Sequence, residues 1–452
     1  MEIALLALYA FAILGLAKAA PKRTDIAFFV NDRASGPWGV AFSIIVSCVG
    51  ASATIGMIGM AFVVGTPAFW WLGMGAVGLL LLSLLLARKV RRSGAYTMPH
   101  MAETFLGKPA RPLIAIVVVI AWSAILAAQF SAVVRVLESL TGFSPLLCLG
   151  AGFFLIVVHT LGGQAAIMRT DRLQALILFF TLLVILGWLS GHNPSWPSLV
   201  TLEATNDQFT PEKWVYFLII VGANYLVCPM LFGRILSARD ERSARLGGLL
   251  AAAGLLVCAA CIMAVGLACR GLLPPETAQD AVLTSVLAQS MPSWMHIVVS
   301  FTLLSAIVSS ADSCLVTAST VLSLDLLGKR SVTSARVCVL LLGLAGAGLS
   351  LWGKGILEYL LMAYDVYACG VVVPVFVGLM LHTHRRIDTR WACAAVIVGG
   401  LCGATAAFSG QTWFSYGGMI LSGLLSCGGA FWSQPHTHDF FAGETSREEY
   451  KK

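Results

Sequence analysis

Apolar segments long enough to cross a lipid bilayer follow one another along nearly the whole chain. They lie near residues 2–20, 38–65, 67–87, 111–140, 145–163, 170–190, 212–233, 245–270, 293–325, 332–352, 354–381, 389–409 and 411–432. In lipid each such segment must satisfy its own backbone polar groups, which a helix does. With 58% hydrophobic and 11% charged residues, the chain has more apolar surface than the core of a soluble protein can bury. The sequence predicts an all-α polytopic membrane protein with about 13 transmembrane helices.

Lysine and arginine gather in every second connecting segment. One cluster is Arg88, Lys89, Arg91 and Arg92, and another begins at Arg234. Because basic loops stay in the cytoplasm, we predict an outer N-terminus, a cytoplasmic C-terminus and an inner loop containing Arg234. The net charge of +7 then reflects topology, and we expect no nucleic-acid partner.

The polar parts of the chain are too short to form a further domain. The sequence contains no G-x-x-x-x-G-K-[ST] loop and no H-E-x-x-H pair, so it shows no means of hydrolysing ATP or peptide bonds. We predict that the protein is not an enzyme and that any transport is driven by a gradient. Nothing in the sequence points to an obligate protein partner.

Two apolar segments are interrupted by glycine, small residues or proline. These are VGASATIGMIGM at 49–60 and VGANYLVCPM at 221–230, five helices apart. Broken helices at matching positions of two halves indicate the midplane site of a secondary transporter. Unwinding frees carbonyl groups, which in lipid need a partner such as a cation. The alternative is a glycine-containing kink that serves helix packing.

The segment 300–320 carries nine hydroxyl side chains and Asp312 within an otherwise apolar span. At about 100° per residue, one stripe of the predicted helix is polar. The stripe contains Thr302, Ser305, Ser309, Asp312, Ser313, Thr317 and Thr320. Hydroxyl groups alone are explained by packing between helices, but an intramembrane carboxylate is a functional-site hypothesis.

Oxygen ligands for sodium are available where this stripe would meet the first broken helix. Sodium prefers hard oxygen ligands, as other hard cations do. The hydroxyls of Ser309 and Ser310 and the carbonyl of Ala306 would supply three. Carbonyls freed near Val46 and Val49 would supply the rest. A cation bound in this way would couple two separate helices.

Asp171 lies at the start of a predicted span, in GGQAAIMRTDRLQ. One interpretation is a solvated carboxylate paired with Arg169 or Arg172. The other is a second cation site, or an inner-gate ion pair, formed with Asp312 and Ser313.

Three further polar residues lie inside predicted spans. Arg135 either pairs with Glu138 three residues later or anchors a carboxylate of the solute. Asp365 is interpreted as a substrate or gate residue, a proton relay, or a partner for Lys354 or Arg135. His159 is expected to pack or cap a helix rather than carry protons.

These motifs, in this order, make the chain resemble the sodium:solute symporter family. The resemblance extends over nearly the whole chain. It rests on the first interrupted span, GTPAFWWL at 65–72, GGQAAIMRTDRLQ at 162–174, RILSARDERSAR at 234–245 and SAIVSSADSCL at 305–315. It implies a LeuT-type fold of two inverted five-helix repeats, 38–190 and 212–381. One helix (2–20) precedes them, and two helices (389–432) and a cytoplasmic tail (433–452) follow, all in one transporter domain.

The resemblance also implies sites. Sodium is the implied coupling ion, with its main site at Val46, Val49, Ala306, Ser309 and Ser310. In members with a second sodium the matching positions are Asp171, Ser309 and Ser313, and the second cation site that we predict comprises Asp171, Asp312 and Ser313. Arg135, Glu138 and Pro229 look closest to the sodium/proline symporters, but Ala53 replaces their carboxylate. Cys228 and Met230 replace the residues that sugar symporters use, which argues against a sugar.

We therefore predict a sodium-coupled symporter that imports a small organic solute, amino acid or carboxylate-like, by alternating access across a bacterial inner membrane. Its partners would be the solute and the lipid bilayer. The residues expected to bind the solute are Gly50, Ala51, Ser52, Gln129, Arg135, Asn224, Cys228 and Asp365. Two alternatives remain, namely a proton-coupled carrier using Asp171, Asp312 or Asp365 and a sensor that binds solute without accumulating it.

Overall fold

The computed structural model describes residues 15, 25–201, 203–381 and 386–433. These residues form helices throughout and no β-strand. The predicted first span at 2–20 lies outside the described residues, apart from residue 15. The all-α prediction is confirmed for the part of the chain that the structure describes.

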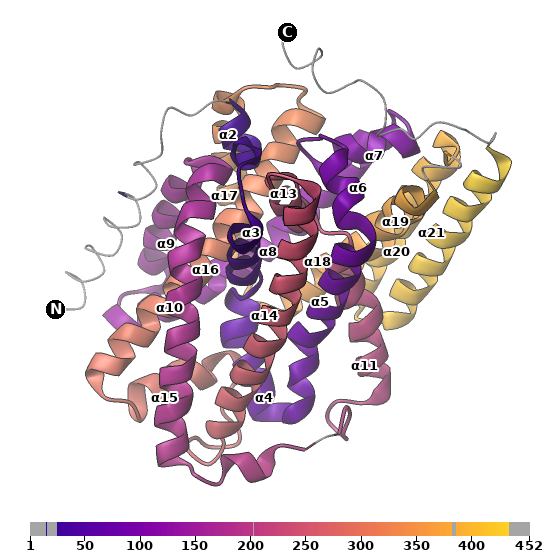
Figure 1. Ribbon diagram of the computed structural model, residues 1–452. Coiled ribbons are helices and arrows are strands. Elements are labelled where there is room, and N and C mark those ends of the chain that lie inside the picture. The colour runs from indigo at the N-terminus through magenta and orange to yellow at the C-terminus, as the bar shows by residue number, and fades with distance from the viewer. Residues whose placement is uncertain (1–14, 16–24, 202, 382–385, 434–452) are drawn as a thin grey trace.

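The first half of the chain opens with a short helix and a broken one (Figure 1). Its helices are α2 (Asp25–Val30), α3 (Pro37–Cys48), the π-helical turn η2 (Ser52–Gly56), α4 (Met57–Val64), α5 (Trp70–Leu81), α6 (Ala87–Arg92), α7 (Met98–Leu106), α8 (Ala110–Thr141), α9 (Pro145–Thr160) and α10 (Gly163–His192).

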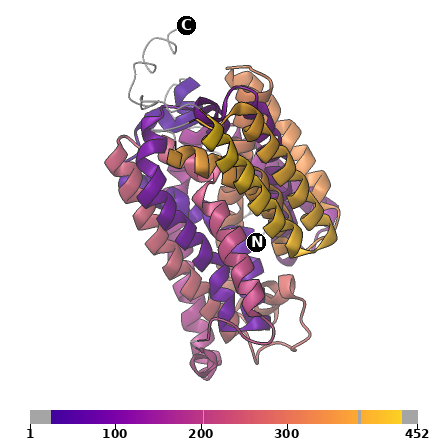
Figure 2. The same ribbon diagram turned by 90° about the vertical axis from the view of Figure 1, so that its right-hand side faces the viewer.

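The second half also contains a broken helix and ends with two further helices. Its helices are α11 (Pro211–Tyr216), the π-helical turn η6 (Phe217–Val221), α12 (Gly222–Leu226), α13 (Pro229–Leu236), α14 (Glu241–Ala268), α15 (Val282–Gln289), α16 (Ser293–Val321), α17 (Val332–Ser350), α18 (Ile356–Tyr367), α19 (Val373–Leu381), α20 (Thr389–Ser409) and α21 (Thr412–Trp432). The last two lie side by side along one edge of the bundle (Figure 2).

Ten helices of the described residues are long and apolar enough to cross a membrane. The bent pair Pro37–Cys48 and Ser52–Val64 adds an eleventh candidate, and Pro145–Thr160 is a shorter apolar helix. The total of about 13 stays a prediction, because the first span lies outside these residues. Helix α16 lies at the centre, packed by α3, α8, α9, α10 and α17.

Both predicted helix breaks are present. Helix α3 ends at Cys48, Val49 has non-helical φ and ψ of −93° and 57°, and the chain bends by 60° before it continues. The second break is at Val227, with φ of −126° and ψ of 83°, and Pro229 begins α13. Proline suits this position because a first helical residue needs no N–H donor.

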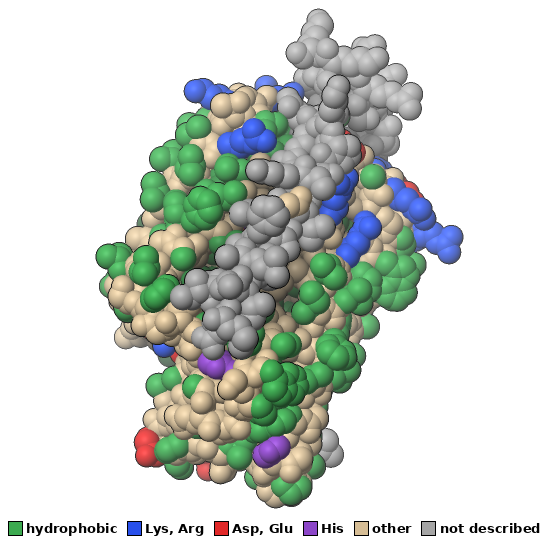
Figure 3. All heavy atoms as spheres, turned by 90° about the vertical axis from the view of Figure 1, so that its left-hand side faces the viewer, with side chains coloured by type: hydrophobic (Ala, Val, Ile, Leu, Met, Phe, Trp, Pro, Cys, Tyr) green, Lys and Arg blue, Asp and Glu red, His purple; other side chains and the backbone are tan. Residues whose placement is uncertain are grey.

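Most of the lysine and arginine side chains visible in Figure 3 lie toward its upper end, whereas acidic side chains are visible at both ends. Arg234 differs from these exposed side chains in being fully buried. The sequence placed it in an inner loop, whereas the structure places it on α13 with no exposed surface. The loop assignment of Arg234 was wrong because it rested on the basic residues that follow it in the sequence.

Candidate functional site

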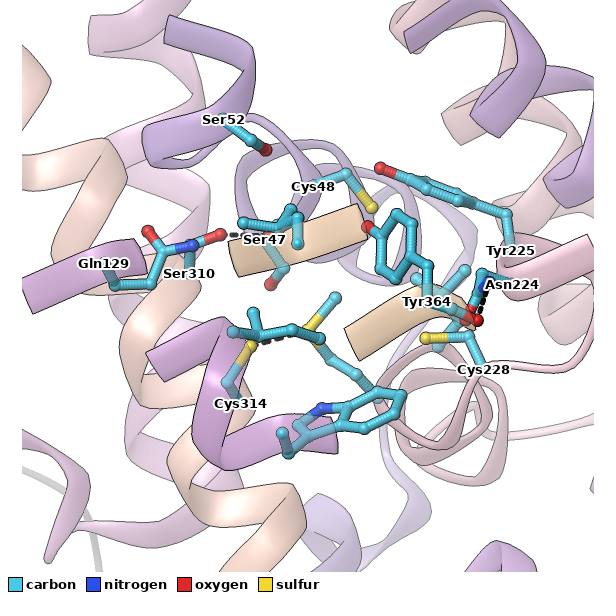
Figure 4. Close-up of a pocket in the computed structure, with 15 residues that line it drawn as sticks. Ser47, Cys48, Ser52, Gln129, Asn224, Tyr225, Cys228, Ser310, Cys314 and Tyr364 are labelled. Atoms are coloured by element: carbon cyan, nitrogen blue, oxygen red, sulfur yellow. Dashed lines mark hydrogen bonds between the residues drawn. The ribbon is translucent and has the colours of Figure 1, made fainter. Parts of the chain in front are cut away.

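The two helix breaks meet at a central cavity of about 40 Å³. Figure 4 shows its wall, with Ser47, Cys48 and Ser52 from the first break and Cys228 from the second. The cavity also borders α8, α12, α16 and α18 through Gln129, Asn224, Tyr225, Ser310, Cys314 and Tyr364. A volume of this size holds a few water molecules at most. A solute would therefore require the cavity to widen.

Side chains from α8 and α16 hold the first break in place. The Ser310 hydroxyl donates to the carbonyl of Ser47. The Ala51 N–H donates to Gln129 Oε1 over 3.1 Å. Gly50 lies so close to Ser310 that a Cβ atom there would overlap its side chain. The broken helix thus contacts α16 directly at the hydroxyl pair that the sequence singled out.

Residues of the predicted main sodium site flank this contact along α3 and α16. Among the described residues, no backbone hydrogen bond around the break ends on the carbonyl of Val46 or Val49. Both residues are fully buried, and a buried carbonyl normally has a polar partner. Ser309 and Ser310 present hydroxyls from α16, one turn after Ala306. This donor set of carbonyl and hydroxyl oxygens fits a hard monovalent cation.

Asp171 on α10 lies beside this region with no exposed surface. Its Oδ1 accepts from Ser309 over 2.7 Å and its Oδ2 accepts from Ser43. The guanidinium of Arg234 lies 3.8 Å from Oδ2 and also donates to Ser313. The surface pairing with Arg169 or Arg172 is not what the structure contains. Instead, a guanidinium stands between two members of the predicted second cation site.

The third member of that site, Asp312, has its carboxylate turned toward α9. Thr160 Oγ1 donates to Oδ1 over 2.7 Å, and His159 Nδ1 contacts Oδ2. All three residues are fully buried. His159 is therefore paired with a carboxylate, whereas the sequence led us to expect a packing or helix-capping role. Both Asp312 oxygens already have partners, so its carboxylate does not point toward Asp171.

Half of the eight residues expected to bind solute line the central cavity, namely Ser52, Gln129, Asn224 and Cys228. Asn224 donates through Nδ2 to the carbonyls of Ile220 and Tyr364. Its Oδ1 is buried and has no hydrogen-bond partner among the described residues. An unsatisfied buried acceptor is costly, so this oxygen is suited to receive a donor from a solute.

Arg135 lies away from this cavity. Its guanidinium lies 3.6 Å from Asp280, on the segment before α15. The predicted partner Glu138 does not form this ion pair, because Asp280 reaches α8 from a loop distant in sequence. Asp280 also accepts the Ile356 N–H over 3.0 Å at the start of α18.

Asp365 also lies apart, in a second cavity between α11, α18 and the turn from α20 to α21. Its Oδ1 accepts from Tyr216 over 2.8 Å and from Ser415 over 2.7 Å. Neither Lys354 nor Arg135 is its partner, because Lys354 pairs with Glu358 four residues later.

Sequence reasoning missed several residues of the central wall. Trp122, Met230 and Cys314 border the cavity, and two of them carried a usable signal. Trp122 precedes Gln129 by seven residues, and Cys314 follows Ser310 by four, so each lies on the same helix face as a predicted residue. Three cysteines, Cys48, Cys228 and Cys314, surround the same space (Figure 4).

Comparison with known proteins places this site in context. The model of the sodium:solute symporter family matches residues 28–399. A curated relative, the sodium/pantothenate symporter of Haemophilus influenzae, is 23% identical over 322 residues. The alignment covers 66% of this chain and 65% of that protein, so the chain spans about two thirds of the relative's length.

Solved structures share the architecture. A Na+-coupled sialic acid symporter in a substrate-bound outward-open state has a TM-score of 0.82 at 14% identity, covering 97% of this chain and 99% of that one. A nucleobase-cation-symport-1 family transporter has a TM-score of 0.63 at 14% identity, with 90% and 94% covered. MhsT in complex with L-phenylalanine has a TM-score of 0.58 at 16% identity, with 88% and 99% covered. The LeuT-type fold is confirmed by these likenesses.

Proposed function

This chain belongs to the sodium:solute symporter family, and we propose that it imports a small amino acid or carboxylate-like solute together with sodium by alternating access. The observation that carries this proposal is the contact between Ser310 on α16 and the Ser47 carbonyl at the first break. Sodium at Val46, Val49, Ala306, Ser309 and Ser310 would strengthen the same contact. Sodium binding would thereby favour one conformation of the two-helix junction over others.

The solute would bind where the two breaks face each other. Ser52 begins the helical segment after the first break, and the N-terminal end of a helix favours a carboxylate. The free Oδ1 of Asn224 would accept an N–H or O–H of the solute. The curated relative is named for pantothenate, a carboxylate, which supports this class. The likeness to proline symporters stays a prediction.

A second cation near Asp171 and Ser313 is also a proposal. It would have to compete with the Arg234 guanidinium, or bind after that guanidinium moves. Asp312 would contribute through its position on α16 rather than as a direct ligand, because α9 engages both of its carboxylate oxygens. We further propose an outer N-terminus, a cytoplasmic C-terminus and a bacterial inner membrane for this integral membrane protein, with transport and no catalysis as its activity.

The solute is identified first by a thermal-shift screen of amino acids, carboxylates and sulfonates on purified protein, with and without sodium. Uptake into proteoliposomes is then measured against external sodium for the parent and for Ser309→Ala with Ser310→Ala. We expect the double variant to need at least about tenfold more sodium, which corresponds to about 1.4 kcal/mol.

Ser319→Ala is the matched control, because Ser319 is also buried on α16 but, among the described residues, its hydroxyl bonds only to the Val316 carbonyl. Unchanged sodium dependence in the double variant would overturn the site assignment. Uptake driven by a pH gradient without sodium would identify a proton-coupled carrier, and binding without accumulation would identify a sensor.

A further inference from the structure

A second cavity of about 610 Å³ lies at the end of the bundle opposite the basic cluster. It is bounded by the start of α11, by α18 and by the turn between α20 and α21. None of its lining residues borders the central cavity. Exposed residues such as Glu212 and Gln411 stand at its rim, so it opens to the surface. Its volume is that of sites that hold organic molecules of drug size.

One carboxylate at this cavity lacks a counter-charge. Asp365 is only 7% exposed and lines the cavity. Its Oδ1 takes both hydrogen bonds, from Tyr216 and Ser415. Its Oδ2 has no hydrogen bond or ion pair with any residue that the structure describes. This oxygen faces the cavity, so an ammonium group that enters can form a charge-assisted hydrogen bond with it.

The other residues that line the cavity favour an organic cation. Phe209, Phe217 and Leu361 contribute apolar surface, and aromatic faces attract organic ammonium groups. Two further acids, Glu212 and Glu358, line the cavity against one base, Lys213. Lys213 donates to the Gln208 carbonyl, and Asp365 is not its partner. The cavity therefore has more acidic than basic groups, with apolar surface along part of its wall.

We propose that this cavity binds an organic cation with an apolar body, whose ammonium group pairs with Oδ2 of Asp365. The site is separate from the solute and sodium sites and does not depend on them. Because Asp365 joins α11, α18 and α21 through Tyr216 and Ser415, an occupant would contact three elements at once.

The probe is 4-phenylbutylamine, with the neutral 4-phenylbutan-1-ol as its isosteric comparison. Binding to the full chain in lipid nanodiscs is measured by calorimetry without sodium or solute, so the result is independent of transport. We expect the amine to bind at least tenfold more tightly than the alcohol. Asp365→Asn should abolish this difference, because its amide oxygen still accepts from Tyr216 and Ser415 but the charge is gone.

Two further variants test whether the amine binds in this cavity. Glu276→Gln removes an exposed acid at the same end, outside the cavity, and should leave amine binding unchanged. Ala407→Trp fills the cavity from α20 without touching the charge, and should also weaken amine binding at least tenfold. Equal binding of amine and alcohol would show an apolar lipid slot instead, and full amine binding by Asp365→Asn or by Ala407→Trp would also overturn the proposal.

Discussion

The guanidinium of Arg234 on α13 lies 3.8 Å from the carboxylate of Asp171 on α10, and neither side chain has any exposed surface. Hydroxyls complete the pair, since Ser43 and Ser309 donate to the carboxylate and Arg234 donates to Ser313. The pair thus connects α3, α10, α13 and α16. It joins helices of both halves of the chain beside the proposed sodium site.

Replacing Arg234 with methionine should be strongly destabilising. Arg234→Met leaves the Asp171 carboxylate buried without its counter-charge, and removing one partner of a buried ion pair costs about 3–5 kcal/mol. The double variant Arg234→Met with Asp171→Asn should regain a large part of that loss, because no isolated charge remains. Thermal unfolding of the purified protein, followed by tryptophan fluorescence, compares the three proteins.

Arg239→Met provides the matched control at the same end of the molecule. Arg239 pairs with Asp240 at the surface, where both side chains are at least half exposed, so its loss should leave unfolding nearly unchanged. Equal effects of the two arginine substitutions would mean that the buried pair carries no special stability.

The helix breaks were predictable because they are local. Glycine and proline interrupt helices, so Gly50 and Pro229 indicate the positions of the two breaks from the sequence alone. The hydroxyl stripe of α16 is also local, since periodicity places Ser309 and Ser310 on one face. Joining these features into a sodium site needed the family resemblance, because periodicity does not show which helices meet.

The electrostatic partners could not be predicted for the same reason. Arg234 and Asp171 are 63 positions apart, and Asp365 finds Ser415 50 positions later. Local patterns favoured neighbours such as Glu138 for Arg135, whereas Asp280 from a distant loop is the partner. Side-chain charge pairing inside a bundle depends on which faces of the helices meet, and composition and spacing do not specify it.

Adding a methyl group at Gly50 should weaken sodium binding. A Cβ atom would overlap the Ser310 side chain, so Gly50→Ala must push the first break away from α16. We expect about tenfold weaker sodium binding, or about 1.4 kcal/mol, measured as the sodium concentration that gives half of the maximal thermal stabilisation. Gly150→Ala, where no atom lies within 4 Å of the added methyl group, should bind sodium as the parent does. Parent-like sodium binding by Gly50→Ala would argue against a sodium site at this contact.

Asp280 should matter more for stability than its partner Arg135. The ion pair is partly exposed, so Arg135→Gln should cost about 0–1 kcal/mol. Asp280→Ala also removes the acceptor for the Ile356 N–H at the start of α18, which adds about 1 kcal/mol as the loss of a helix cap does. Thermal unfolding ranks the two variants. A larger loss for Arg135→Gln would show that the helix-capping bond of Asp280 contributes little.

Asp312 should affect stability and leave sodium binding unchanged. Its oxygens are engaged by Thr160 and His159 on α9, so Asp312→Asn disturbs a buried pair between α16 and α9. Loss of a hydrogen bond to a buried charged group costs about 1–3 kcal/mol. The half-saturating sodium concentration should stay at the parent value, whereas Ser309→Ala, measured beside it, should raise it. An increase in Asp312→Asn as large as that in Ser309→Ala, with unfolding unchanged, would instead make Asp312 a direct cation ligand, with its carboxylate turned from α9 toward the sodium site when the ion binds.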